Sequence, residues 1–288
     1  MNRTKIILSP ILPYLRLIRA DAPIGYWLLL WPCWLSVALS KPPIENMPRL
    51  LLLFLLGAVV MRSSGCIFND IIDRNYDALI TRTKQRPIAN GEISVTRAIL
   101  LMLALGLLGF IILIQFNAIT IFIGICSLPL IATYPFMKRI TWWPQLWLGL
   151  TFNWGALLGW TATNGSLELP ALILYAAGIT WTLGYDTIYA HQDKVGDAMI
   201  GVKSAALRLG NKSKAAVSSF YFLTIVGLIV ATTISNLSYT AYVGVIVGAM
   251  QLAWQVNRVD FDDPEICLTM FKSNHLFAAL VFTGFLIG

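Results

Sequence analysis

The sequence predicts an all-α protein that crosses a membrane nine times. The first observation behind this prediction is composition. Of the 288 residues, 57% are hydrophobic and 12% are charged, against about 25% charged residues in a typical soluble domain. The 21 basic and 14 acidic side chains are too few to cover a water-solvated core, so lipid has to solvate the rest of the surface. With a mean hydropathy of +0.72, this composition excludes a soluble enzyme, a disordered chain and a secreted disulfide scaffold.

Apolar windows along the chain are the second observation. A hydrocarbon layer of ~30 Å needs about 20 apolar residues per helix. Windows of this kind centre on 24–40, 49–68, 98–115, 118–135, 144–163, 169–190, 214–234, 239–256 and 273–288. Because nine such helices use most of the chain, we expect residues 1–288 to form a single integral-membrane domain.

The distribution of basic residues is the third observation. They gather in the amino-terminal segment and in the loops after the second, fourth, sixth and eighth windows, whereas the opposite loops hold only Lys41 and Arg49. The positive-inside rule therefore predicts a cytoplasmic amino terminus, and it accounts for the net charge of +7 without a nucleic-acid partner. Residues 1–23 are interrupted by Pro10 and Pro13 and resemble neither a signal peptide nor a transit sequence, so we expect a bacterial inner membrane.

An acidic stripe is predicted at the cytoplasmic end of the second window, in the stretch NDIIDRNYD. At about 100° per residue, Asp70, Asp73 and Asp77 project within roughly 60° on a helix, and Asn69 extends that face to about 100°. Like charges at this spacing destabilise a helix, and a carboxylate in the bilayer costs about 2.5–3.5 kcal/mol on insertion scales. A compensating cation is therefore expected at this stripe.

A second acidic stripe is predicted at the cytoplasmic end of the sixth window. Asp186, Tyr189, Asp193 and Asp197 stand within roughly 80° of one another if the helix stays regular that far. If the two stripes face each other, they form an acidic funnel. Mg²⁺ prefers oxygen ligands and is usually held by one or two carboxylates plus substrate phosphates, so the pattern favours Mg²⁺ shared with a diphosphate. The alternative is two solvated helix ends whose acids pair with neighbouring basic residues.

Several basic residues near these stripes are candidates for substrate binding. Arg82, Arg86 and Lys203 follow the acids most closely in sequence and could donate to phosphate oxygens, although positive-inside anchoring explains many such residues equally well. Arg62 lies about two turns before Asn69, inside an apolar window, and intramembrane ionisable groups usually face the interior of the bundle. We expect Arg62 to face a pocket.

Four stretches taken in order, NDIIDRNYD, TRTKQRPIANG, YPFMKR and YDTIYAHQDKVGDAMIGVKS, resemble the UbiA superfamily of membrane prenyltransferases over about residues 16–210. The stretch RADAPIGYWLLLWPCW and the second Asp motif are similar to those of the family members that act on 4-hydroxybenzoate in ubiquinone biosynthesis. The resemblance implies nine helices around a central cavity with a lateral opening for the lipid. It also implies Mg²⁺-dependent transfer of a polyprenyl group from polyprenyl diphosphate to the carbon ortho to the hydroxyl of 4-hydroxybenzoate.

Residue roles follow from the same resemblance. The metal-binding motifs of the family fall on Asn69, Asp70, Asp73 and Asp77 and on Asp193 and Asp197, and its Tyr-x-x-x-Lys element falls on Tyr134 and Lys138. Asp193 is a candidate base for the ring proton, with Asp186 as a rival, and Arg139 or Arg62 is expected to pair with the benzoate carboxylate. Many relatives carry an acidic residue in place of Gly196 and a Lys in place of Ala22, and the first departure could weaken a metal contact.

Three other functions stay open at this stage. A secondary transporter could also carry acidic helix ends about 120 residues apart, but transporter acids concentrate near the bilayer midplane. A nonenzymatic membrane scaffold would not need two acidic stripes. Within the enzyme class, prenylation of haem, naphthoate or chlorophyll precursors is possible, although the second motif favours hydroxybenzoate.

Overall fold

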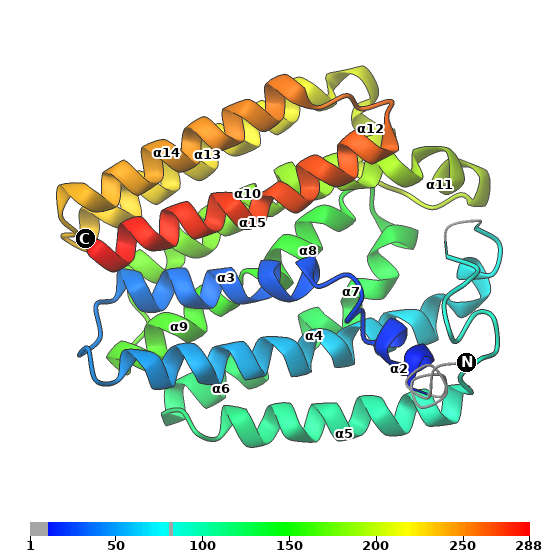
Figure 1. Ribbon diagram of the computed structural model, residues 1–288, viewed down its shortest axis with the longest axis horizontal. Helices are drawn as coiled ribbons and strands as arrows, with labels where there is room; N and C mark the ends of the chain where they lie inside the picture. Colours follow the sequence, from blue (N-terminus) through cyan, green and yellow to red (C-terminus); the bar gives the residue numbers. More distant parts are fainter. Residues whose placement is uncertain (1–10, 81–82) are drawn as a thin grey trace, which may run out of the picture. The chain divides into compact units, whose positions relative to one another are not determined.

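The computed structural model describes residues 11–80 and 83–288, and all regular structure within them is helical. The first half contains α2 (Leu12–Leu17), α3 (Ile24–Leu39), α4 (Met47–Asp77), α5 (Val95–Leu113), α6 (Ala118–Cys126) and α7 (Leu128–Ile140). The second half contains α8 (Pro144–Phe152), α9 (Gly155–Asn164), α10 (Leu169–Ala190), α11 (Lys194–Ile200), α12 (Ala205–Leu209), α13 (Ser213–Ile234), α14 (Tyr239–Arg258) and α15 (Pro264–Ile287) (Figure 1). Short 3-10 turns, η1 (His191–Asp193) and η2 (Gly210–Lys212), precede α11 and α13. The all-α prediction is confirmed.

Five helical segments in the described parts of the chain are long and apolar enough to cross a membrane. They are Met47–Asp77, Val95–Leu113, Ala118–Ile140, Ala205–Ile234 and Pro264–Ile287. Each contains or largely overlaps one of the predicted windows, but the count of nine spans is not confirmed. The window 24–40 forms the shorter apolar helix Ile24–Leu39, and the window 144–163 is divided between α8 and α9.

Polar residues explain why the remaining windows fall outside this set. At the division between α8 and α9, the Asn153 side chain donates to the Gly149 carbonyl at 2.9 Å and competes with continuation of the helix. Helices α10 and α14 are 22 and 20 residues long. They carry buried polar side chains such as Thr182 and Gln255, which lower their hydropathy.

The chain divides into two compact units, and the first comprises Met1–Trp27 and Leu55–Gln115. Within it α5 packs along α4, where the Ser64 hydroxyl donates to the Met102 carbonyl at 3.2 Å. A small core of Leu17, Ile67, Ile88, Ile93 and Ala98 joins α2, α4, the loop after α4 and the start of α5. This core supports the end of α4 that carries the first acidic stripe.

The second unit comprises Leu28–Phe54 and Phe116–Gly288. Here α10 packs against α13, and α14 packs against α15 (Figure 1). Helices α14 and α15 approach closely because both carry glycine at the crossing: a Cβ built on Gly244 would lie 2.6 Å from the Gly284 Cα. Small residues at such crossings are typical of membrane helix packing.

A buried hydrogen-bond network also joins α10, α13, α14 and α15. The Tyr221 hydroxyl donates to Gln255 Oε1 at 2.8 Å, and the Trp181 indole donates to Asn274 Oδ1 at 2.8 Å. Gln255 Nε2 donates to Gln251 Oε1 at 3.1 Å. In a bilayer such groups have no water to bind. Their hydrogen bonds to one another therefore hold these helices in one register.

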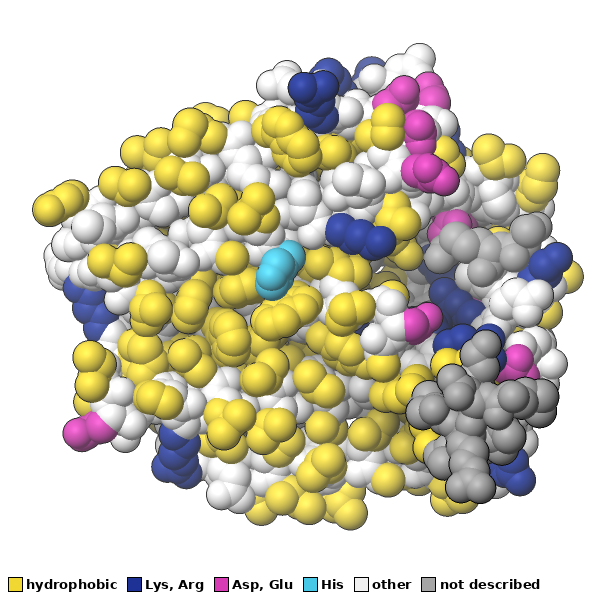
Figure 2. Space-filling view, viewed as in Figure 1, with side chains coloured by type: hydrophobic (Ala, Val, Ile, Leu, Met, Phe, Trp, Pro, Cys, Tyr) yellow, Lys and Arg dark blue, Asp and Glu magenta, His cyan; other side chains and the backbone are white. Residues whose placement is uncertain are grey.

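Exposed hydrophobic side chains are abundant on the helices. Leu103, Leu107, Phe122, Phe222 and Met250 are each at least half exposed. Figure 2 shows hydrophobic side chains over much of the visible face. A water-soluble protein does not tolerate so much exposed apolar surface, so this pattern fits a lipid-solvated protein.

Candidate active site

The first acidic stripe lies at the carboxyl end of α4, in the first unit. Helix α4 has 31 residues, or ~46 Å at 1.5 Å per residue, which exceeds the ~30 Å hydrocarbon layer. Its last turns can therefore reach the polar zone of a membrane. The side chains of Asp70, Asp73 and Asp77 are buried, at 1%, 0% and 4% exposure, and Asn69 is partly exposed. The helix is continuous through Asp77, as the spacing argument required.

Arg86 bridges two carboxylates of this stripe. A single guanidinium nitrogen, Nη1, donates to Asp70 Oδ1 at 3.1 Å and to Asp77 Oδ2 at 2.8 Å. The loop that carries Arg86 is anchored beside it, because the buried Thr83 hydroxyl donates to the Asp77 carbonyl at 3.0 Å. One cationic nitrogen thus lies between two buried carboxylates.

Arg19, which the sequence analysis did not select, binds the same stripe. Its Nη2 donates to both carboxylate oxygens of Asp70, at 2.7 and 2.8 Å, and its Nη1 donates to the Arg16 carbonyl at 2.9 Å. Arg19 lies in the connector between α2 and α3 with a φ of 65°. Left-handed backbone is uncommon for a residue other than glycine and clusters at functional sites. No helical periodicity reaches this connector, so the spacing argument could not find Arg19.

Arg62 lies two turns earlier on α4 and contacts α3. A Cβ built on Gly25 would lie 2.7 Å from Arg62 Nε, so only glycine leaves room for this guanidinium. Tyr26 is the next residue on α3, and its hydroxyl lies 3.3 Å from the Ser63 hydroxyl. The stretch that carries the resemblance near residue 25 therefore packs directly on Arg62. Arg82, the other candidate of this unit, lies outside the described residues.

The second acidic stripe, in the second unit, does not lie on one regular helix. Helix α10 ends at Ala190, a 3-10 turn follows over His191–Asp193, and α11 begins at Lys194. Asp186 is therefore on α10, Asp193 is in the turn, and Asp197 is on α11, all partly exposed. The estimate that these residues share one helix face assumed a regular helix and fails across this break.

The structure brings the Tyr-x-x-x-Lys segment next to the residues that follow the second stripe. Tyr134, Lys138 and Arg139 lie on α7, and the backbone N–H of Lys203 donates to the Lys138 carbonyl at 2.8 Å. Lys203 Nζ donates to the Ile140 carbonyl at 3.0 Å. This bond places the ammonium at the negative end of α7.

Two further contacts hold residues 203–205 against the end of α7 and the residues that follow it. The buried Gln145 side chain accepts from the backbone N–H of Ala205 at 3.1 Å. Lys203 Nζ also lies 5.8 Å from the centre of the Trp142 ring. Arg139 is exposed and stacks on Phe136, with its Cζ 5.8 Å from the ring centre. The segment 203–205 therefore holds the end of α7, so Lys203 has a structural role besides the phosphate contact predicted for it.

His191 is a buried titratable group at the break after α10. Its ring nitrogens lie 3.1 Å from the Phe261 carbonyl and 2.9 Å from the Ser213 hydroxyl. Burial lowers the pKa of His191 from its ordinary value, and the positive charge of Lys194 lowers it further. The imidazole is therefore neutral near pH 7, and it ties the turn to the loop before α15.

The α4 stripe fits a hard divalent cation in donor chemistry. Carboxylate and amide oxygens are the ligands that Mg²⁺ prefers, and the nitrogen held between Asp70 and Asp77 shows where a positive centre is stabilised. Over residues 11–80 and 83–288, however, no three His, Cys, Asp or Glu side chains are already arranged as a ligand set.

Comparison with known proteins decides the family. The model of the UbiA prenyltransferase family matches residues 29–281. This chain belongs to the UbiA prenyltransferase family. A UbiA relative, the mitochondrial 4-hydroxybenzoate polyprenyltransferase of Aedes aegypti, is 46% identical over 96% of this chain and 63% of its own length. The mitochondrial enzyme of the same name from Caenorhabditis elegans is 46% identical over 94% of this chain and 77% of its own length. This chain thus spans less than two thirds of the first relative.

Solved UbiA structures share the fold. A UbiA homologue from Aeropyrum pernix K1 superposes with a TM-score of 0.77 at 23% identity, covering 91% of this chain and 97% of the homologue. A UbiA homologue from Archaeoglobus fulgidus, solved with GPP and Mg²⁺, gives a TM-score of 0.70 at 19% identity, covering 95% of this chain and 99% of the homologue. At this identity the likeness establishes the UbiA membrane fold and not the ligands of this chain.

The UbiA relatives correct one expectation. The prediction of a bacterial inner membrane is wrong, because both relatives described above are mitochondrial enzymes of animals. The physical reason is that the positive-inside rule reports on which side of a membrane a loop lies and carries no information about which membrane it is. The multi-pass membrane character does not depend on that prediction and is supported by the five apolar segments.

Proposed function

We propose that this UbiA-family chain transfers a polyprenyl group from polyprenyl diphosphate to the carbon ortho to the hydroxyl of 4-hydroxybenzoate, in ubiquinone biosynthesis. The names of the relatives that are 46% identical support the acceptor and the reaction class. The A. fulgidus homologue, solved with GPP and Mg²⁺, supports an allylic diphosphate donor and a divalent metal. The observation in this structure that carries the proposal is the cationic nitrogen held between Asp70 and Asp77.

Both acidic motifs are proposed to bind metal. Asp70, Asp73 and Asp77, with Asn69 beside them, and the pair Asp193 and Asp197 are the proposed ligands. Mg²⁺ bound at such carboxylates would neutralise the charge that builds on a departing diphosphate. The chain's own cations are proposed to contribute as well. Arg86 can donate to phosphate oxygens once it leaves the carboxylates, and Arg82 is proposed to do the same.

The aromatic acceptor needs a base and a partner for its carboxylate. After the electron-rich ring attacks the allylic carbon, the ring carbon must lose a proton, and Asp193 is the proposed acceptor, with Asp186 as the rival. Arg139, exposed on Phe136, or Arg62, packed over Gly25, is proposed to pair with the benzoate carboxylate.

Tyr134, Lys138 and Lys203 complete the proposed site in the second unit. Tyr134 and Lys138 are proposed to serve the catalytic step, as their match to the family's Tyr-x-x-x-Lys element implies. Lys203 is proposed to contribute a positive charge for phosphate, although its ammonium also holds the end of α7. We further propose that the chain forms one membrane domain of nine spans around a central cavity. The family match over residues 29–281, which covers parts of both compact units, supports a single domain.

A defined assay tests this function. Purified protein in detergent, Mg²⁺, a polyprenyl diphosphate and 4-hydroxybenzoate should yield the prenylated acid, identified by mass, with no ion gradient present. Asp73→Asn should lower the rate by at least about 100-fold while the protein unfolds at a similar temperature, because the carboxylate would serve the metal. Glu45→Gln, in an exposed loop, is the matched control and should leave the rate unchanged. Full activity of Asp73→Asn, or activity that survives chelation of divalent cations, would contradict the proposal.

A further inference from the structure

The arginine contacts of the α4 stripe point to a property beyond the transfer reaction itself. We propose that Arg19 and Arg86 form a cationic plug, which neutralises Asp70 and Asp77 in the metal-free protein and which a divalent cation has to displace. The inference rests on the proposed function in one respect, the assignment of the α4 carboxylates to Mg²⁺. It assigns to Arg19 a role in setting metal affinity.

The first argument is charge balance. The Asp70 carboxylate is 1% exposed, and a buried ion without a counter-charge is strongly unfavourable. Among the described residues, the guanidinium groups of Arg19 and Arg86 form ion pairs with Asp70 and Asp77. Arginine stays protonated at every physiological pH, so Arg19 and Arg86 do not lose their charge. If they leave ionised carboxylates, another cation has to take their place.

The second argument is space. Arg19 Nη2 lies 2.7 and 2.8 Å from the two oxygens of Asp70, so both oxygens are already engaged. Arg86 Nη1 lies between Asp70 and Asp77 at 3.1 and 2.8 Å. Magnesium binds oxygen at about 2.0–2.1 Å. A metal ion that takes oxygens from both carboxylates would therefore need the place of that nitrogen.

The third argument is the backbone at Arg19. The residue has a left-handed φ of 65°, and its guanidinium is bonded to Asp70 and to the Arg16 carbonyl. Some of the backbone bonds in the connector involve Arg19 itself, such as that from the Ala22 N–H to the Arg19 carbonyl at 3.1 Å. Displacement of Arg19 by a metal should therefore loosen the connector between α2 and α3.

Two variants test the plug by metal binding rather than by turnover. Arg19→Gln removes the guanidinium from Asp70. Arg16→Gln is the matched control, because Arg16 lies on the same segment and its side chain pairs with Glu92 instead of the stripe. Mg²⁺ affinity is measured by calorimetry on the purified full chain without diphosphate, and the melting temperature is measured with and without Mg²⁺. Hydrogen exchange of a peptide covering residues 15–26 reports on the connector.

The plug predicts opposite changes in two quantities. Arg19→Gln should bind Mg²⁺ about tenfold more tightly than the unmodified protein, yet melt at a lower temperature when no metal is present. Arg16→Gln should match the unmodified protein in Mg²⁺ affinity. In the unmodified protein Mg²⁺ should speed exchange over residues 15–26, whereas in Arg19→Gln this exchange should be fast already. A purely structural Arg19 would lower the melting temperature without raising the affinity.

The outcomes separate this inference from the proposed function. If Asp73→Asn leaves Mg²⁺ affinity unchanged, the α4 metal site itself is wrong. If Asp73→Asn abolishes binding but Arg19→Gln binds no more tightly than the unmodified protein, the plug alone is overturned. Should Arg19→Gln fail to fold, Arg19→Lys replaces it, since it keeps the charge but offers one nitrogen. A gain of about two- to fivefold is then expected, and no gain overturns the plug.

Discussion

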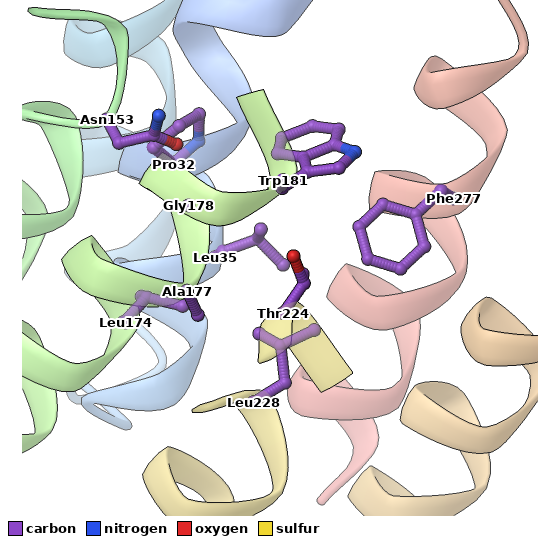
Figure 3. A pocket seen from close by; sticks show the side chains of 10 residues that line it. All are labelled: Pro32, Leu35, Asn153, Leu174, Ala177, Gly178, Trp181, Thr224, Leu228 and Phe277. Carbon is purple, nitrogen blue, oxygen red and sulfur yellow. The ribbon is translucent and has the colours of Figure 1, made fainter. Parts of the chain in front are cut away.

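Replacement of Gly178 by alanine tests the close approach of α10 to the division between α8 and α9. A Cβ on Gly178 would lie 2.9 Å from the Asn153 Cβ and 2.5 Å from its Cγ, with Oδ1 closer still. Figure 3 shows both residues at a small apolar cavity of about 20 Å³, which Trp181 and Phe277 also line. A cavity of this size holds no more than about one water molecule, so it does not offer Asn153 an alternative position.

The cost follows from what Asn153 would lose. Its side chain is buried, at 1% exposure, and its Nδ2 donates to the Gly149 carbonyl at 2.9 Å and to the Thr182 hydroxyl at 2.8 Å. Overpacking a filled core costs about 1–3 kcal/mol, and a buried amide without its partners costs about 1–3 kcal/mol more. The free energy of unfolding of Gly178→Ala should therefore fall by about 2–6 kcal/mol.

Thermal unfolding in detergent, followed by circular dichroism, measures this loss. Gly106→Ala is the matched control, because a Cβ on Gly106 in α5 meets nothing within 4 Å. That variant should be neutral or slightly stabilised, since alanine is the better helix former. In an Asn153→Ala background the same Gly178→Ala change should cost less, because Oδ1 and Cγ are gone and only the Cβ contact at 2.9 Å remains. If it costs as much in that background, or if both glycine variants behave alike, the steric reasoning is refuted.

Other predictions concern stability. Because the pKa of His191 is lowered by burial and by a nearby lysine, the unfolded chain binds the proton more tightly. Stability should therefore fall as pH drops below about 6.5, and His191→Gln should flatten that part of a melting-temperature profile; an unchanged slope would contradict this. Lys203→Met removes an exposed bond to the Ile140 carbonyl and should cost about 0.5–1 kcal/mol on thermal unfolding, whereas a loss above that would show a larger role. Gln255→Leu leaves the buried Tyr221 hydroxyl without its acceptor and should lower the free energy of unfolding by about 1–3 kcal/mol. A variant as stable as the unmodified protein would show that this network does not hold the helices together.

The sequence predicted best those features that depend on one continuous helix. The end of α4 is helical through Asp77, so the 3.6-residue period placed Asp70, Asp73 and Asp77 correctly on one stretch. The apolar windows likewise predicted α5 and α15, where nothing interrupts a long hydrophobic run. In these elements local spacing determines the arrangement, because each residue turns the chain by the same angle.

The sequence predicted less well where the backbone changes direction. The window 144–163 looked like one span, but Asn153 hydrogen-bonds to its own preceding turn and the helix divides there. The run from Asp186 to Asp197 crosses a 3-10 turn. Beyond that turn, the rotation of about 100° per residue no longer predicts which side chains share a face. Gly201, at a φ of 72°, ends α11 soon afterwards. Composition alone cannot separate such breaks from a continuous apolar helix.

Arg19 shows what a single sequence cannot supply. Its partner Asp70 is 51 residues away, and no period of 3.6 or 2 relates them. Its place beside the carboxylate depends on a left-handed backbone in a short connector. Arginine rarely adopts that conformation, so the sequence does not predict it. Such a conformation persists only where the surrounding contacts compensate for it, and here the compensation is the two-oxygen contact with a buried carboxylate. If that contact holds the connector, a substitution at Asp70 should relax Arg19 as well, so that Asp70→Asn and Arg19→Gln increase hydrogen exchange over the same residues.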